Sequence, residues 1–368
     1  MKKILLTGGG TAGHVTPNLA LVPGLRQAGF TIEYMGSYDG IEKTLVEKAG
    51  IPYHGISSGK LRRYMDLKNL TDPVRILKGL HEARLYMKKH RPDIVFSKGG
   101  FVSVPVVIAA AEYKIPVVIH ESDLSPGLAN KLAIPRATKV CYSFPETAKY
   151  LSNAKAIFTG LPVRDELLNG SREKGLELCG FAGDKPVLMV IGGSLGSVAV
   201  NSAVRSALDS LLTTFDVVHS CGKGKYDADL DGTAGYKQFE YISDELPDIY
   251  AAADVIISRA GANVINELAA LKKPALLIPL GLDASRGDQL LNADSFKKRG
   301  FADVLKEEDM NHRVLLSKVN ELYKNRSIYI DAMSADDQGD AVRRIIDIIC
   351  QTAEEGSTKH AGRQKARN

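Results

Sequence analysis

One device occurs twice in this chain and constrains its fold more than any other feature: an apolar strand that runs directly into a glycine-rich loop. Residues 4–6 lead into Gly8-Gly9-Gly10-Thr11-Ala12-Gly13-His14, and residues 187–191 lead into Gly192-Gly193-Ser194-Leu195-Gly196. Short apolar runs are typical of buried parallel strands, and glycine permits the tight turn into a following helix. A chain of 368 residues is too long for one core, so the sequence predicts two doubly wound Rossmann-like α/β domains.

The expected first domain covers residues 1–163 and the second covers residues 164–340. A closing helix is expected over residues 341–352, packing back toward the first domain. Residues 353–368 are polar and basic without an apolar period, which predicts a disordered tail.

Composition excludes several classes of protein. The chain runs from Met1 straight into a strand, without a signal peptide, and no apolar run approaches the length needed to cross a bilayer. The four cysteines are far apart and lack metal-ligand spacing, which indicates reduced, mostly buried thiols of a cytosolic protein. The formal charge of +5 is mild, so its distribution matters more than its size.

A strand–loop–helix–strand unit lies between residues 253–257 and residues 274–279. Gly261 allows the tight turn, the helix is expected to begin near Ala262, and Glu267 then lies about one and a half turns in. A helix N-terminus offers N–H groups to an anion, and a carboxylate just inside accepts hydrogen bonds from hydroxyls. Diphosphate plus ribose is a ligand that needs both. The alternative is a crossover helix with an exposed glutamate.

The first glycine loop also satisfies the dinucleotide-binding pattern G-x-G-x-x-G, through Gly8, Gly10 and Gly13. Glu33, expected at the end of the strand formed by residues 31–35, stands about where that pattern places its ribose-binding acid. Two residues argue against this interpretation. Pro17 places the helix start near residues 16–17, after the glycines, and His14 suits a substrate that approaches closely and loses a proton.

Further strand ends carry glycine or polar clusters. Residues 94–97 lead into Lys98-Gly99-Gly100-Phe101, and residues 115–119 lead into His120-Glu121-Ser122-Asp123. In a parallel sheet these clusters fall along one carboxyl edge. His120 and Glu121 are either part of an active-site wall, which we favour, or caps of a strand end.

Two such domains are expected to face each other across a cleft. The first offers His14, and the second offers Ser194, the helix at Ala262, Glu267 and Gln289. A nucleotide opposite an acceptor is the arrangement of a sugar transferase. The charge of a departing diphosphate can be offset by helix N–H groups and an arginine, for which Arg164 is a candidate, so neither a metal nor a cofactor is expected.

Residues 60–91 are strongly basic. Three acidic residues, Asp66, Asp72 and Glu82, oppose ten basic ones: Lys60, Arg62, Arg63, Lys68, Arg75, Lys78, Arg84, Lys88, Lys89 and Arg91. Apolar residues at 76, 80, 83 and 87 share one helical face. The segment is either an ordinary amphipathic helix or a patch for an anionic membrane surface. Nucleic acid is not expected, because aromatic stacking residues and known modules are missing from it.

Five ordered motifs resemble the MurG family of bacterial GT-B glycosyltransferases, and the similarity extends over nearly the whole chain. They are residues 7–14, 120–123, 160–164, 192–196 and 258–262. The resemblance implies an inverting, metal-independent transfer of N-acetylglucosamine from UDP-N-acetylglucosamine to the 4-hydroxyl of the N-acetylmuramoyl-pentapeptide of undecaprenyl-pyrophosphate-linked lipid I. The product is lipid II of peptidoglycan synthesis. The implied location is peripheral, on the cytoplasmic face of the bacterial cell membrane.

The resemblance also assigns roles. It makes His14 the base, and it gives each domain a set of substrate-binding residues. Those residues are Thr11, Ala12 and Gly13 for the acceptor diphosphate region, Arg164, Ser194 and Gln289 for the donor, Ile242 for uracil, and Ala262, Asn263, Val264, Ile265, Asn266 and Glu267 for diphosphate and ribose.

The chain departs from the family pattern at three places. Ser122-Asp123 replaces Gln-Asn of some members, which puts an amide contact to the sugar in doubt. Val264 replaces a threonine, so the helix would bind phosphate through its backbone. The first loop carries Ala12 where many relatives have glycine, a minor variant. A UDP-sugar 2-epimerase, an NAD-dependent oxidoreductase and a non-catalytic nucleotide-binding scaffold stay open as alternatives.

Overall fold

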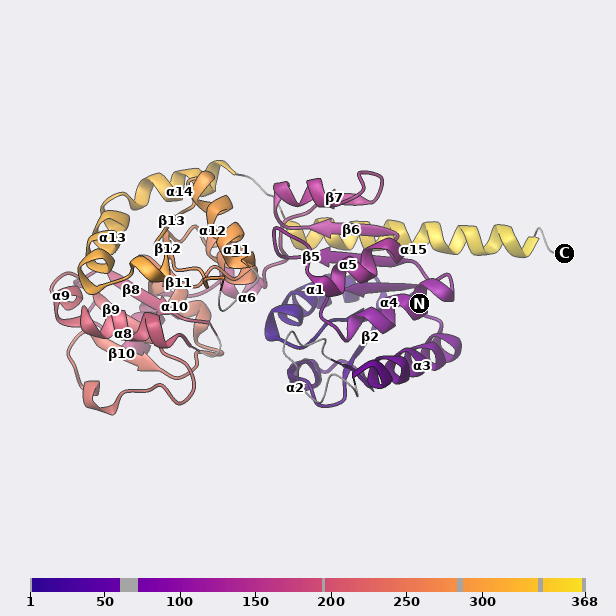
Figure 1. The fold of residues 1–368 in the computed structure, drawn as a ribbon, viewed down its shortest axis with the longest axis horizontal. Helices are drawn as coiled ribbons and strands as arrows, with labels where there is room; N and C mark the ends of the chain where they lie inside the picture. The colour runs from indigo at the N-terminus through magenta and orange to yellow at the C-terminus, as the bar shows by residue number, and fades with distance from the viewer. Residues whose placement is uncertain (1, 60–71, 194–195, 283–286, 337–339, 366–368) are drawn as a thin grey trace. The chain divides into compact units, whose positions relative to one another are not determined.

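The computed structural model describes residues 2–59, 72–193, 196–282, 287–336 and 340–365. The chain divides into two compact units (Figure 1). The first unit comprises Met1–Arg164 together with Gln338–Asn368, and the second comprises Asp165–Asp337. The expected division put Arg164 at the start of the second domain, whereas it is the last residue before the second unit. Within the described residues, none of the helices is both long and apolar enough to cross a bilayer.

The first unit is built on a seven-stranded parallel sheet in the order β3-β2-β1-β4-β5-β6-β7. Its strands are β1 (Lys2–Thr7), β2 (Phe30–Ser37), β3 (Tyr53–Ile56), β4 (Ile94–Ser97), β5 (Val117–Glu121), β6 (Lys139–Tyr142) and β7 (Ala156–Phe158). The order reverses at β1, so the loops after β1 and β4 lie at the topological switch point, where open α/β sheets bind ligands.

The second unit repeats this plan with a six-stranded parallel sheet in the order β10-β9-β8-β11-β12-β13. Its strands are β8 (Val187–Ile191), β9 (Asp216–Ser220), β10 (Tyr236–Phe239), β11 (Val255–Ser258), β12 (Ala275–Leu277) and β13 (Ala302–Val304). Here the order reverses at β8. The predicted fold class of two doubly wound parallel-sheet domains is confirmed.

Helices cover both faces of each sheet. The first unit has α1 (Thr16–Gln27), α2 (Ile41–Lys48), α3 (Asp72–His90), α4 (Ser103–Glu112), α5 (Leu128–Ala133) and α15 (Ala341–Lys365), with short turns η1 (Ala12–His14), η3 (Ile134–Arg136) and η4 (Pro145–Tyr150). The second has α6 (Asp165–Leu168), α7 (Arg172–Cys179), α8 (Val198–Ser206), α9 (Leu208–Leu212), α10 (Leu246–Ala252), α11 (Ala262–Ala270), α12 (Asp288–Lys298), α13 (His312–Lys324) and α14 (Arg326–Ala335), with turns η5 (Ala228–Leu230) and η6 (Glu307–Asp309).

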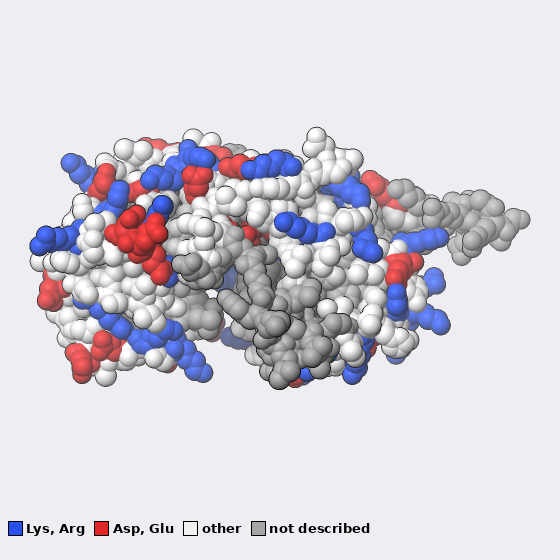
Figure 2. All heavy atoms as spheres, viewed as in Figure 1, with Lys and Arg blue, Asp and Glu red and all other residues white. Residues whose placement is uncertain are grey.

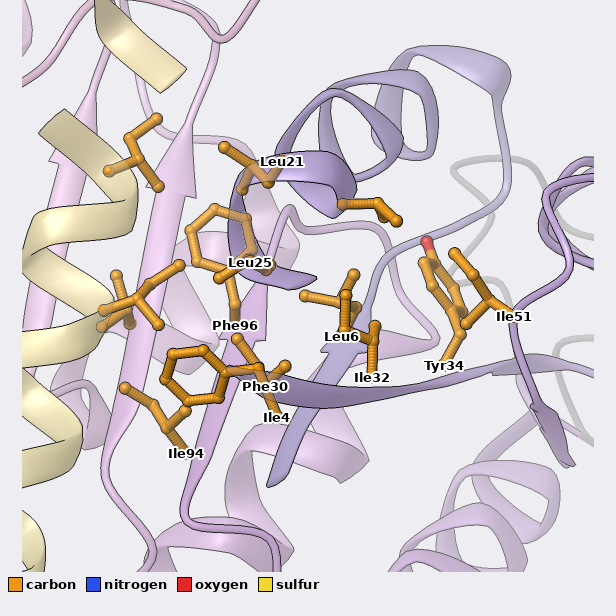
Figure 3. Packing of buried hydrophobic residues seen from close by; sticks show 14 of the residues in the cluster. Ile4, Leu6, Leu21, Leu25, Phe30, Ile32, Tyr34, Ile51, Ile94 and Phe96 are labelled. Carbon is orange, nitrogen blue, oxygen red and sulfur yellow. The ribbon is translucent and has the colours of Figure 1, made fainter. Parts of the chain in front are cut away.

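Strand alternation divides the first unit's core into two layers. Ile4 and Leu6 face α1 and α15 in the layer of Figure 3, whereas Leu5 faces α3 and α4 on the other side. Burying an aliphatic side chain of this size stabilises the fold by about 1.5–3 kcal/mol. α15 can approach α1 closely because Gly24 has no side chain; a Cβ there would lie 2.3 Å from Cδ1 of Ile346.

Two local predictions were wrong. Glu33 was expected at the end of its strand, but β2 continues to Ser37, so Glu33 lies in mid-strand and hydrogen-bonds His54 and Tyr86 instead of facing a ligand edge. The tail from residue 353 was predicted to be disordered, but α15 continues to Lys365. Ala353 is fully buried in the first unit's core, so apolar contact extends past the expected helix end.

Candidate active site

The first glycine loop leaves β1 at the carboxyl edge of its sheet, and α1 begins at Thr16, as predicted. Two buried side chains, Asn18 and Tyr34, hydrogen-bond the backbone where the loop begins. Nδ2 of Asn18 donates to the Thr7 carbonyl oxygen at 3.2 Å, and the Tyr34 hydroxyl donates to the Gly8 carbonyl oxygen at 2.8 Å. The loop therefore has a fixed conformation before any ligand arrives.

Glycine is required where the loops after β1 and β4 touch. The Gly9 N–H donates to the Gly99 carbonyl oxygen at 3.3 Å. Gly100 has φ +84°, and a Cβ on it would lie 2.2 Å from the Gly9 carbonyl oxygen. The buried carboxylate of Glu42 accepts the Gly10 N–H at 3.1 Å. The two loops thus form one rigid surface.

His14 stands on this surface, half-buried in the η1 turn. Its Nδ1 lies 3.0 Å from Oγ1 of Thr11. Ala12 and Gly13 are also half-buried and complete the turn. The structure therefore brings together the four residues predicted to meet the acceptor.

A buried lysine lies next to this loop. Lys98 is 1% exposed, and its Nζ donates to Nδ1 of His120 at 2.8 Å and to Oγ of Ser122. Nε2 of His120 lies 2.8 Å from the Gly160 carbonyl oxygen, so Nε2 carries the ring proton and Nδ1 accepts. Burial and the Lys98 charge hold the pKa of His120 well below its ordinary value, so the ring is neutral.

Glu121 ends β5 and organises the next loop. Its carboxylate accepts hydrogen bonds from the backbone N–H of Asp123 at 3.0 Å, from that of Gly127 at 3.1 Å, and from Nδ2 of Asn130 at 2.8 Å. Burial raises the pKa of Glu121, the nearby Asp123 charge adds to this, and the hydrogen bonds oppose it. His120 and Glu121 are both buried and bond to neighbouring loops, which agrees with the interpretation as caps of a strand end; the favoured interpretation, that they form part of an active-site wall, stays a prediction.

The second glycine loop is held by an arginine. Arg259 follows β11 directly and is 9% exposed. Its Nη2 donates to Oγ of Ser197 at 2.6 Å, and its Nη1 donates to the Ile278 carbonyl oxygen at 3.1 Å. Ser197 caps α8 by accepting the Val200 N–H at 3.3 Å. Arg259 thus joins the carboxyl ends of β8, β11 and β12.

The predicted helix begins at Ala262, with Gly261 as its N-cap. Asn263, Val264 and Glu267 are half-buried, so they lie at an accessible face. Ile265 is fully buried, and Nδ2 of buried Asn266 donates to the Ala262 carbonyl oxygen at 2.7 Å. The structure therefore turns the side chains of Ile265 and Asn266 toward the interior and away from any ligand.

Of the other predicted donor contacts, Gln289 and Ile242 lie in the second unit, whereas Arg164 lies in the first. Oε1 of Gln289 in α12 accepts the Leu280 N–H at 3.1 Å, beyond the end of β12. Ile242 follows β10 and has a buried side chain. Arg164 is half-buried after β7 in the first unit. Ser194 lies outside the described residues.

A neutral histidine network lies behind the second glycine loop. Nε2 of buried His219 donates to Oδ1 of Asn201 at 3.0 Å, and its Nδ1 accepts from the Tyr236 hydroxyl at 2.8 Å. Nδ2 of Asn201 donates to the Cys221 carbonyl oxygen at 2.8 Å. Burial, with the Arg205 charge, lowers the pKa of His219 to about 3.

This network makes the second unit sensitive to acid. The unfolded chain protonates His219 near pH 6.5, about its ordinary pKa, whereas the folded unit resists protonation until about pH 3. Stability is therefore fully present above pH 6.5 and falls as the pH drops below it, by about 1.4 kcal/mol per pH unit. Urea unfolding at pH 7.5 and 5.5 should show wild type losing about 1.4 kcal/mol more than His219→Gln. Equal losses in the two proteins would contradict this.

Two protein-family models match the chain. The glycosyltransferase family 28 N-terminal domain matches residues 4–142, and the glycosyltransferase family 28 C-terminal domain matches residues 187–348. The chain belongs to glycosyltransferase family 28.

Relatives within family 28 match over nearly their whole length. A protein of Lachnospira eligens is 62% identical, with 95% of this chain and 99% of that protein covered. A protein of Clostridium botulinum is 57% identical with the same coverage. Both are named UDP-N-acetylglucosamine--N-acetylmuramyl-(pentapeptide) pyrophosphoryl-undecaprenol N-acetylglucosamine transferase. The crystal structure of Acinetobacter baumannii MurG is 29% identical, with a TM-score of 0.74 over 95% of this chain and all of that one. The resemblance to the MurG family is confirmed.

Sequence reasoning assigned no role in the family 28 site to Lys98 or Arg259. Both are cations placed directly after a short apolar strand, β4 and β11 respectively. A residue in that position is still within the sheet's edge, so its side chain can turn inward among the neighbouring strand ends. The position of a cation directly after a strand was the signal that could have indicated a buried role. The hydrogen-bond partners of each side chain come from distant parts of the chain, which a local pattern does not contain.

Proposed function

We propose that this chain is a hexosyltransferase that moves N-acetylglucosamine from UDP-N-acetylglucosamine to the 4-hydroxyl of the N-acetylmuramoyl-pentapeptide of undecaprenyl-pyrophosphate-linked lipid I. The product is lipid II of peptidoglycan synthesis, formed with inversion at the anomeric carbon. The observation that carries the proposal is the match, over nearly the full length of both chains, to transferases whose name states this donor and this acceptor.

The second unit binds the donor in this proposal. The backbone N–H groups in the first turn of α11 bind the diphosphate, because the Val264 side chain has no hydroxyl to donate. Glu267 accepts hydrogen bonds from the ribose hydroxyls, and the Ile242 backbone reads uracil. Gln289 contacts the sugar, and Ser194 also contacts the donor. Arg164, the last residue of the first unit before the second begins, is a further proposed donor contact. Arg259 has an indirect role, because it hydrogen-bonds the loops that bind the donor diphosphate and fixes their positions.

The first unit binds the acceptor. The loop from Thr11 to Gly13 meets the acceptor's sugar and diphosphate, with N–H groups at a helix entrance. His14 accepts the proton of the attacking hydroxyl as the new glycosidic bond forms and the bond to UDP breaks. UDP departs with the electron pair of the broken bond.

The test is UDP release with a short-chain lipid I analogue. Wild-type protein should release UDP only when UDP-N-acetylglucosamine and the analogue are both present, and the product should contain a new β-linked N-acetylglucosamine. UDP-glucose and NAD serve as control nucleotides. Conversion of UDP-N-acetylglucosamine to its 2-epimer without acceptor would instead identify an epimerase. Failure to form the disaccharide product with active analogue would overturn the proposal.

The acceptor is a lipid, and the surface of α3 suits a membrane. Large apolar side chains are exposed on this helix beside basic ones: Val74 at 66%, Leu77 at 66% and Leu85 at 55%, with Arg75, Lys78 and Lys88 also exposed. Figure 2 shows Lys and Arg side chains around this part of the first unit. Lys60, Arg62, Arg63 and Lys68 of the predicted patch lie outside the described residues. We propose that α3 attaches the protein to anionic lipid on the cytoplasmic face of the cell membrane.

Neutralising part of this surface should weaken attachment. Each basic residue near an anionic surface is worth about 1 kcal/mol, so Arg75→Gln with Lys88→Gln should lower the vesicle partition coefficient roughly tenfold or more. Arg84 is left unchanged because it pairs with Glu112 at 2.7 Å. Sedimentation with phosphatidylglycerol vesicles measures the effect, and Lys174→Gln with Lys324→Gln, both exposed in the second unit, is the control. Equal partitioning of the two variants would mean that α3 has an ordinary solvated face.

A further inference from the structure

The loop after β5 carries the hydroxyl of Ser122, which a buried lysine, Lys98, orients by a hydrogen bond. Ser122 is half-buried at the carboxyl edge, and its Oγ receives a hydrogen bond from Nζ of Lys98. Charged Lys98 has three donors and cannot accept, so in that form Oγ of Ser122 is the acceptor in this contact. The Ser122 proton therefore points to another partner.

Lys98 directly follows β4 and is hydrogen-bonded to the ends of β1 and β5. Its backbone N–H donates to the Thr7 carbonyl oxygen at 2.9 Å, at the end of β1. Its Nζ donates at 2.8 Å to His120, whose Nε2–H is engaged by the Gly160 carbonyl oxygen. With its ring proton committed there, His120 can only accept from Lys98. The ammonium therefore has a fixed place and cannot turn toward a ligand itself.

A buried ammonium is costly unless other charges compensate it. Burial lowers the pKa of Lys98 to about 7, and the charges of Glu121 and Asp123 act against this lowering by favouring the charged form. In the charged form of Lys98 the hydrogen bond to Ser122 is charge-assisted, and such bonds are roughly twice as strong as neutral ones. A hydroxyl that accepts from a cation becomes a better donor through its own proton, because hydrogen bonds in a chain polarise one another.

We propose that Ser122 is a further acceptor-binding residue, which donates its hydroxyl proton to an oxygen of the acceptor, and that Lys98 is its positioning residue. The inference rests on the proposed function, because the first unit must be the acceptor unit. Ser122 follows β5, two strands from β1 in the sheet, on the same carboxyl edge as His14. The loop after β4, which carries Lys98, connects the two positions.

Ser122→Ala tests the contact with little risk to the fold, because Ser122 is half-buried in a loop. The lost hydrogen bond should raise KM for the short-chain lipid I analogue roughly tenfold, while KM for UDP-N-acetylglucosamine stays within about twofold. Ser152→Ala is the matched control, exposed just before β7 at the opposite edge of the same sheet. If wild type is active and Ser122→Ala has an unchanged acceptor KM, the role of Ser122 is overturned while the proposed function stands. An inactive wild type would instead count against the proposed function.

Lys98→Met then separates positioning from mere structural support. If Lys98 acts through Ser122, the double variant Lys98→Met/Ser122→Ala should have the same acceptor KM as Lys98→Met alone, so the two changes are not additive. Additive effects on acceptor KM would overturn the positioning role. If Lys98→Met does not fold, Lys98→Arg keeps the cation, and it should retain an acceptor KM that is sensitive to Ser122→Ala.

Discussion

Replacing His14 by alanine is expected to lower kcat by at least about a hundredfold, while the affinity for UDP-N-acetylglucosamine stays nearly unchanged. A sugar hydroxyl is a poor nucleophile until a base accepts its proton, and such help is typically worth about 10²–10⁴-fold. His14 is half-buried on the first glycine loop, whereas Lys98 and Glu121 of that edge are buried; Asp123, which follows Glu121, is half-buried as well. His14 is the titratable side chain of the glycine loop itself, at the position where the acceptor is proposed to bind.

The contact with Thr11 bears on the tautomer. A base needs a ring nitrogen with a lone pair, so Nδ1–H of His14 should donate to Oγ1 of Thr11 across their 3.0 Å contact, which leaves Nε2 to accept. His14→Ala and the control His312→Ala, an exposed histidine of the second unit, are compared by initial rates at saturating acceptor. A His14→Ala enzyme that keeps its kcat and loses only acceptor KM would show that His14 instead binds the acceptor diphosphate as a cation.

Glu267→Ala is expected to weaken UDP-N-acetylglucosamine binding about tenfold to a hundredfold. A hydrogen bond to a charged group contributes about 1.5–3 kcal/mol, and Glu267 lies at an accessible position of α11, about one and a half turns from its N-terminus. The fold should be intact, because the buried face of the helix is formed by Ile265 and Leu268.

Titration calorimetry with UDP measures the Glu267 effect without catalysis. Glu177→Ala, an exposed carboxylate on α7 of the same unit, is the matched control. Uridine offers a second comparison, since it retains the ribose and lacks the diphosphate, and its affinity should fall by a similar factor. Donor affinity within about twofold of wild type would exclude the ribose contact.

Much of the fold could be predicted because the decisive signals are local. Pro17 and Gly261 mark where α1 and α11 begin, and the apolar runs before them have the length of buried strands. Glu33 was misplaced for the same reason: the strand pattern fades at Gly36 and Ser37, although β3 still pairs with both residues there. A strand end is set by its neighbour in the sheet, which a local pattern does not contain.

The site was less accessible to prediction wherever a role depends on distant partners. In the sequence, Lys98 followed by Gly99 is typical of a solvated loop. Its buried role is visible only in the structure, where His120 and Ser122 lie beside it. Arg259 was visible as part of a motif, but its role as a support for three strand ends depends on Ser197. The start of α11 at Ala262 was predicted correctly, but a helix turns part of any contiguous run inward, so the side chains of Ile265 and Asn266 are buried.

The path of the chain has a consequence for biosynthesis. Ile345, Ile349 and Ala353 of α15 are fully buried in the core of the first unit, yet they follow the whole of the second unit in sequence. During synthesis the second unit can emerge and fold while the first still exposes the apolar groove that α15 fills. The first unit is complete only when these last turns of α15 have been made, so a nascent chain interrupted before residue 345 carries an incomplete first unit and a complete second unit.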